Sequence, residues 1–168
     1  RLWQFSYILA FSKEHHIKVS YPGFDEYANY FQGTKNNTFC SYPTINLPIL
    51  VPKYLRYIIF NSVRLIKRIF LLVGLKNRLY KHIWVRPGEY FDLDDPINID
   101  LLTQYDVVTL EGWLIRCNTS LNNHSGFIRS FFKPIKKYRI PIDKLFESIK
   151  KDNDIIVGVM IRQEDNYP

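Results

Sequence analysis

The sequence predicts an α/β fold, and three segments carry that prediction. Residues 2–15 place apolar side chains at helical spacing, and residues 17–21 (IKVSY) are typical of a short strand. Residues 154–161 are almost all apolar, as expected of a strand buried in a parallel sheet. A strand near residue 107, the helices that follow it and this last strand would together form a strand–helix–strand crossover. A length of 168 residues corresponds to about one domain.

The elements between these segments follow from local signals. Residues 24–52 are rich in aromatic and turn-forming residues, which predicts mostly loop with a helical turn near 25–31. Residues 82–86 and 107–110 are predicted strands, the first ended by Pro87-Gly88 and the second continuing toward Trp113. Residues 118–125 are polar and predicted as loop, and residues 127–132 and 142–151 as helices separated by Pro134 and Pro141.

Composition excludes several classes of protein. Hydrophobic residues make up 46% and charged residues 23% of the chain, which is typical of a globular protein. No uncharged apolar run reaches the ~18 residues that a membrane-spanning helix needs. Two cysteines, Cys40 and Cys117, exclude a multi-disulfide scaffold and a four-cysteine zinc site. A reducing, cytoplasmic location is the resulting expectation, and one disulfide bridge stays open. Because the chain starts at Arg1 and stops after an apolar run, we expect it to be part of a longer protein.

The positive charge is concentrated in residues 53–81. This segment holds eight basic residues and no acidic one, whereas the rest of the chain holds 15 basic and 16 acidic residues, so the segment accounts for the net charge of +7. Its pattern predicts a helix with Arg56, Arg64, Lys67 and Arg68 on one face. That helix could pack on the core with a solvated cationic face, or lie peripherally on the anionic inner face of a membrane. Nucleic acid is not an expected partner because no nucleic-acid-binding motif accompanies the charge.

Asp92-Leu93-Asp94 matches an Asp-x-Asp pattern that could hold Mn²⁺ or Mg²⁺. Its context, DLDDP, favours a turn instead, so no metal site is predicted. His15-His16, His82 and His124 lack further ligands at zinc spacing and are interpreted as isolated side chains.

The end of the last predicted strand is the strongest local signal for a binding site. In an open α/β sheet, ligands bind beyond the carboxyl ends of the strands. Arg162 directly follows the apolar run, and an arginine there can bind a phosphate or carboxylate through two parallel hydrogen bonds. Asp165 could orient this arginine or cap a following helix. A surface arginine beside a helix cap is the alternative that spacing leaves open.

The closing peptide VGVMIRQEDNY resembles a conserved peptide, G-V-H-I-R-R-x-D-Y, of the α-1,2/α-1,6-fucosyltransferase superfamily. Gly158, Val159, Ile161, Arg162 and Asp165 match, whereas Met160 and Gln163 replace the usual His and second Arg. The opening residues resemble the bacterial family 11 branch, G-x-L-G-N-Q/R-L-F-Q-Y-A-x-A. The residues shared with that branch are Arg1, Leu2, Gln4 and Ala10. FDEYANYF and EGWLIR also look like segments of bacterial members of this group.

The resemblance implies the Rossmann-like N-terminal half of a GT-B-type glycosyltransferase. Residues 1–152 would form this acceptor-side half, and residues 153–168 the truncated start of the nucleotide-sugar-binding half. The implied reaction is inverting, metal-independent transfer of fucose from GDP-fucose to a glycan or glycolipid, with no cofactor. The family's diphosphate-contacting role carries over to Arg162, with Gln163 and Asp165 beside it in the nucleotide-sugar site. Arg1 and Gln4 would belong to the loop after a first strand that lies upstream.

Four other functions stay open. The chain could be a non-catalytic relative that binds a glycan or nucleotide, since Gln163 carries no charge where the family has a second arginine. It could be a transferase for another nucleotide-sugar, or a metal-dependent one that uses Asp92 and Asp94. It could also be a basic domain that binds membranes or nucleic acid, which predicts a steep loss of binding with salt.

Overall fold

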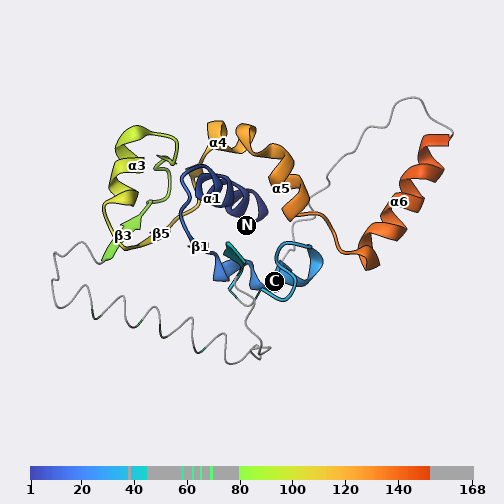
Figure 1. The fold of residues 1–168 in the computed structure, drawn as a ribbon, viewed down its shortest axis with the longest axis horizontal. Coiled ribbons are helices and arrows are strands. Elements are labelled where there is room, and N and C mark those ends of the chain that lie inside the picture. Colours follow the sequence, from blue (N-terminus) through green and yellow to red (C-terminus); the bar gives the residue numbers. More distant parts are fainter. Residues whose placement is uncertain are drawn as a thin grey trace, which may run out of the picture. The chain divides into compact units, whose positions relative to one another are not determined.

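A computed structural model describes residues 1–37, 39–44, 58, 62, 65, 69 and 80–151 of the chain. Two compact units are present, Arg1–Lys133 and Pro134–Pro168. Figure 1 shows the helices and short strands of the described residues. The predicted boundary between residues 152 and 153 stays a prediction. No helix among the described residues is long and apolar enough to cross a membrane.

Helix α1 (Leu2–Glu14) is the centre of the first unit and confirms the helix predicted over residues 2–15. Helices α4 and α5 lie along it (Figure 1). Phe5, Leu9 and Ala10 belong to one buried cluster, and Phe11 belongs to a second. Trp3, one of the apolar side chains at helical spacing, is 70% exposed. The helix buries parts of two faces because two separate clusters pack against it.

After α1, two short strands pair with each other, and a 3₁₀ helix lies between them in the sequence. Strand β1 (Val19–Ser20) pairs antiparallel with β2 (Ser41–Tyr42), within the predicted strand 17–21. The 3₁₀ helix η1 (Pro22–Tyr30) confirms the helical turn predicted near residues 25–31. Its Phe24 and Ala28 join the cluster around Phe5, so the aromatic-rich segment supplies part of the core.

A parallel strand–helix–strand unit follows from residue 80. Strand β3 (Tyr80–Trp84) pairs in parallel with β5 (Val107–Glu111), and α3 (Pro96–Thr103) lies between them in the sequence. A second parallel pair joins β4 (Phe91–Asp92) to β6 (Ile115–Arg116). The predicted strands at 82–86 and 107–110 are therefore confirmed with small shifts. Helix α3 was missed, although Asp95 accepts a hydrogen bond from the backbone N–H of Ile97 and Pro96 occupies the first helical position.

The predicted loop over residues 118–125 is wrong. This stretch forms α4 (Asn118–Asn123) and the start of α5 (Ser125–Phe131). The local sequence favours caps and turns because Asn and Ser side chains compete for backbone hydrogen bonds. Helix formation here depends on a carboxylate from elsewhere in the chain, described below.

The second unit contains α6 (Lys136–Lys151), which begins six residues before the helix predicted over 142–151. Pro141 lies inside α6, so it does not mark the start of this helix. A proline inside a helix removes one backbone hydrogen bond, at a cost of about 3 kcal/mol. The prediction placed the boundary at this proline, whereas the helix continues through it.

Two predicted elements lie largely or wholly outside the described residues. The strand at 154–161 is outside them, as is most of the cationic helix at 53–81. That helix was predicted to reach Lys81, but Tyr80 and Lys81 belong to β3. The described residues thus form a mixed fold with helices and small parallel and antiparallel sheets, which confirms the general α/β class. The Rossmann-like GT-B architecture stays a prediction.

Candidate functional site at the start of the first helix

Two predicted site residues, Arg1 and Gln4, lie at the start of α1. Arg1 Nη1 donates a hydrogen bond to Glu26 Oε2 at 2.6 Å, and its guanidinium lies over the Tyr27 ring. Both partners belong to η1, so Arg1 connects the start of α1 to that helix. The ion pair is largely exposed, with 44% and 71% of the two side chains accessible, so it contributes little to stability.

Gln4 uses both ends of its amide to connect three segments. Its Nε2 donates to the carbonyl oxygen of Gly112, and its Oε1 accepts from the Tyr21 hydroxyl at 2.6 Å. Burial raises the pKa of Tyr21, and the nearby positive charge of Arg1 opposes that rise. A neutral Tyr21 therefore donates to Gln4. Gln4 is thus a positioning residue, which holds the start of α1 beside β1 and the segment after β5.

Gly112 follows β5 directly and has a backbone that requires glycine. Its φ is +149°, and a Cβ built there would lie 2.6 Å from Val85 Cβ and 2.7 Å from the Val85 carbonyl oxygen. Val85 follows β3, and its backbone N–H donates to the backbone carbonyl oxygen of Glu111 at 2.8 Å. Gln4 therefore reaches the carboxyl edge of the parallel pair β3–β5, which is where open α/β sheets bind ligands.

The three tryptophans of the chain are all exposed, and each is a close sequence neighbour of this edge or of Gln4. Trp3 precedes Gln4, Trp84 is the last residue of β3, and Trp113 follows Gly112. Their exposed fractions are 70%, 58% and 73%, and the Arg86 guanidinium lies over the Trp84 ring. Large aromatic side chains left on a surface are typical of binding sites because each exposes an apolar face together with a hydrogen-bond donor. No signal in the sequence had distinguished these tryptophans from core residues.

Arg162, Gln163 and Asp165 lie outside the described residues, so their predicted roles stay predictions. Cys40 and Cys117 are both buried, and no disulfide bridge joins them. Burial, with Asp94 nearby, raises the pKa of Cys117 to about 12, which makes its thiol a poor nucleophile at neutral pH.

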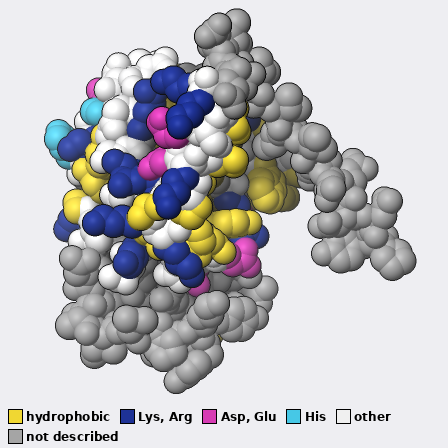
Figure 2. Space-filling view, turned by 90° about the vertical axis from the view of Figure 1, so that its right-hand side faces the viewer, with side chains coloured by type: hydrophobic (Ala, Val, Ile, Leu, Met, Phe, Trp, Pro, Cys, Tyr) yellow, Lys and Arg dark blue, Asp and Glu magenta, His cyan; other side chains and the backbone are white. Residues whose placement is uncertain are grey.

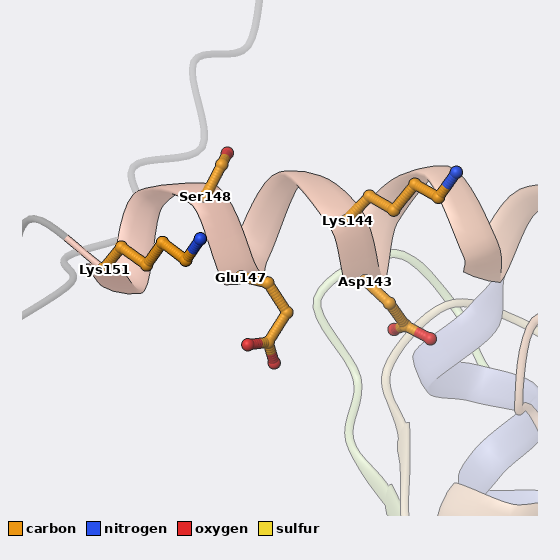
Figure 3. A pocket seen from close by; sticks show the side chains of 5 residues that line it. All are labelled: Asp143, Lys144, Glu147, Ser148 and Lys151. Carbon is orange, nitrogen blue, oxygen red and sulfur yellow. The ribbon is translucent and has the colours of Figure 1, made fainter.

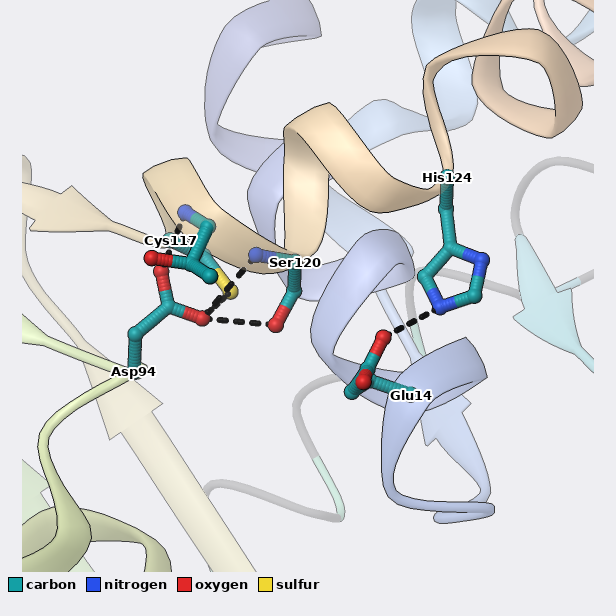
Figure 4. Close-up of polar contacts among 6 residues, drawn as sticks. Glu14, Asp94, Cys117, Ser120 and His124 are labelled. Carbon is teal, nitrogen blue, oxygen red and sulfur yellow. Dashed lines mark hydrogen bonds and ion pairs between the residues drawn. The ribbon is translucent and has the colours of Figure 1, made fainter.

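The turn predicted at Asp92–Asp94 is confirmed. The backbone N–H of Asp94 donates to Asp92 Oδ1 at 3.0 Å. The Asp94 carboxylate accepts from Thr119 N at 2.7 Å and from Ser120 N and Oγ at 3.2 and 2.6 Å, and Cys117 Sγ lies 3.2 Å away (Figure 4). Asp94 therefore caps the start of α4. Within the part of the chain that the structure describes, no three His, Cys, Asp or Glu side chains are grouped to hold a metal ion.

Stability in acid is expected to depend on Asp94. Burial raises its pKa, but the hydrogen bonds from Ser120, Cys117 and Thr119 outweigh burial and lower the pKa below the usual 3.8. A group with a lowered folded-state pKa stabilises the fold above its unfolded pKa, and this contribution is lost as the pH falls through the folded value. Asp94→Asn should therefore lower the free energy of unfolding at neutral pH and reduce its decline toward acid.

Urea titrations at neutral pH and near pH 3 measure both effects. The exposed Asp106 offers a matched control, and Asp106→Asn should change stability by less than about 0.5 kcal/mol. If the free energy of unfolding of Asp94→Asn fell toward acid as steeply as that of the parent, the negative charge of Asp94 would not be what stabilises the start of α4.

Two of the histidines interpreted as isolated have acidic partners, which corrects that interpretation. His124 Nε2 lies 2.5 Å from Glu14 Oε2 and connects the end of α1 to the junction of α4 and α5 (Figure 4). His82 Nε2 lies 3.8 Å from Glu111 Oε2 on the neighbouring strand. Both contacts join structural elements and place no histidine beside Arg1 or Gln4.

Hollows along the described residues include two that lie away from Gln4. One, of about 230 Å³, lies at the end of α1 and is bordered by Lys13, His16, Lys18 and Tyr42, among others. The other, of about 510 Å³, is bordered by five residues of α6, among them Asp143, Lys144 and Glu147 (Figure 3). These five residues come from one helix and cannot enclose a ligand by themselves.

No protein-family model, curated protein or solved structure matches this chain. The resemblance to fucosyltransferases therefore rests on the opening and closing peptides and on the segments FDEYANYF and EGWLIR.

Proposed function

We propose that this chain is the N-terminal part of a glycosyltransferase that transfers fucose from GDP-fucose to a glycan or glycolipid. The observation that carries the proposal is the position of Gln4, from the opening peptide, at the carboxyl edge of the β3–β5 pair. This edge is the expected place for a ligand in such a sheet. The exposed tryptophans that neighbour this edge or Gln4 in the sequence support a carbohydrate ligand, since aromatic faces stack on the apolar faces of sugar rings.

In the proposed reaction, an acceptor hydroxyl attacks the sugar's anomeric carbon. The bond from that carbon to the diphosphate oxygen breaks, GDP leaves, and the hydroxyl proton is lost to a base. Negative charge therefore grows on the diphosphate. Arg162, carried over from the family peptide, would stabilise this charge more in the transition state than in the ground state, so it would accelerate the reaction.

The test is GDP-fucose transfer by the full-length protein, with and without EDTA, beside Arg162→Ala. Losing one such donor typically reduces the rate by ~10²–10³-fold, so the variant should lose activity while EDTA leaves the parent unaffected. Arg129→Ala, in α5, is the control for loss of an exposed arginine. Activity that does not depend on Arg162, or that requires another nucleotide-sugar, would overturn the donor assignment.

A non-catalytic glycan-binding relative is the second candidate, because the exposed tryptophans are expected in either case. Both candidates predict that Trp113→Ala weakens glycan binding. Only the transferase predicts turnover of GDP-fucose by the full-length protein.

A further inference from the structure

Helix α6 has an apolar face that the described residues of its own unit leave exposed. No residue of α6 is buried, and Ile142, Leu145 and Phe146 are 46%, 59% and 56% exposed. At about 100° per residue, these three, with Tyr138, Pro141 and Ile149, occupy an arc of roughly 140°. Exposing such a continuous apolar stripe to water is unfavourable, so it marks a surface that meets a partner.

The charges of α6 indicate which partner. The helix carries six basic residues and two acidic ones. Lys137 and Arg139 fall just beyond the two margins of the apolar arc, and Lys144 and Lys150 follow within about 60° of them. The acidic Asp143 and Glu147 fall on the polar side between these lysines. Lys136, Lys151 and the exposed Ile140 also lie on that side. Figure 3 shows these two carboxylates on one side of the helix and Lys144 on another.

This arrangement fits a membrane interface better than a protein core. Lysine and arginine at the margins can lay their alkyl stems along the apolar boundary and extend their charges to lipid headgroups. The acidic side chains would then face water, away from the lipid. Asp143 Oδ2, on one of them, lies 3.5 Å from Arg139 Nε. With 16 residues, six of them basic, α6 would lie in the interface plane and would not span the bilayer.

We propose that α6 docks the protein on anionic lipid surfaces. This surface is distinct from the cationic segment at 53–81, and the proposal does not depend on glycosyltransferase activity. Figure 2 shows hydrophobic side chains exposed beside Lys and Arg on one face of the molecule. The apolar face would enter the headgroup boundary, and each marginal lysine would add attraction that salt screens.

The test is co-sedimentation of the whole chain with vesicles of phosphatidylcholine, with or without about 30% phosphatidylglycerol. Binding should require the anionic lipid and should weaken as salt is raised. Lys144→Gln/Lys150→Gln should weaken binding about fivefold for each lysine. Leu145→Gln/Phe146→Gln leaves the charge unchanged and should weaken binding at least tenfold. Circular dichroism checks that each variant keeps its helix.

Lys18→Gln/Lys35→Gln is the matched control, because it removes the same charge from exposed residues of the first unit. It should change binding by less than about twofold. An equal loss in the control and in the α6 lysine pair would mean that net charge alone attracts the protein. Equal binding to neutral vesicles, or no binding to either, would also overturn the proposal. Concentration-dependent self-association that Leu145→Gln/Phe146→Gln abolishes, without vesicle binding, would assign the face to a second copy of the chain.

Discussion

Replacing Phe5 by alanine is expected to lower the free energy of unfolding by about 3–5 kcal/mol. The Phe5 side chain is fully buried. The centroid of its ring lies 5.1 Å from the ring centroid of Tyr21 and 5.2 Å from that of Phe24. The rings of Phe131 and Phe132 meet it edge-on. Because these neighbours come from two separate segments, around residues 21–24 and 131–132, they cannot close together over the cavity that alanine leaves.

Urea unfolding of the whole chain measures this loss. Trp3→Ala is the matched control, since it removes a larger ring from the same helix at a position 70% exposed. It should cost less than about 1 kcal/mol. Equal losses in the two variants would mean that the ring cluster around Phe5 does not form the core of this unit.

Most of the elements with local signals could be predicted from the sequence. Helix α1 follows from its apolar spacing, and β3 and β5 from short runs with apolar and β-branched residues bounded by turn signals. Their parallel pairing could not be derived, because it depends on contacts between segments more than 20 residues apart. Helix α4 could not be found locally either, because the Asp94 carboxylate that caps it lies outside the helical segment. Helix α3 differs, since Asp95 and Pro96 formed a recognisable start signal.

The candidate site was only partly predictable. Arg1 and Gln4 were selected through a resemblance, and nothing in their own residue types indicated that Gln4 would contact Gly112. The exposure of the three tryptophans could not be derived, since tryptophan is more often buried and each lies in an apolar context. Residues 162–165 depend on a strand outside the described residues. The positioning network around Gln4 is therefore the part of the site that the structure adds.

Gly112, whose carbonyl oxygen Gln4 contacts, is sensitive to the addition of a single methyl group. Gly112→Ala should lower the free energy of unfolding by about 2–4 kcal/mol, because a positive φ disfavours alanine and its Cβ would overlap Val85. Gly126 is the matched control, since it lies exposed in α5 with no atom within 4 Å of an added Cβ. Gly126→Ala should instead stabilise the protein by up to about 1 kcal/mol, through helix propensity.

The same substitution also tests whether Gln4 acts through Gly112. Gln4→Met removes the amide's hydrogen bonds to Gly112 and Tyr21 while keeping the side chain's length. If alanine at position 112 displaces the carbonyl that Gln4 contacts, Gln4→Met should cost less in the Gly112→Ala background than in the parent. The double-mutant cycle should then show a coupling of about 0.5–3 kcal/mol, as contacting residues do. Strict additivity would mean that the start of α1 is held at the sheet edge by packing alone, and Gln4 would lose its role as a positioning residue.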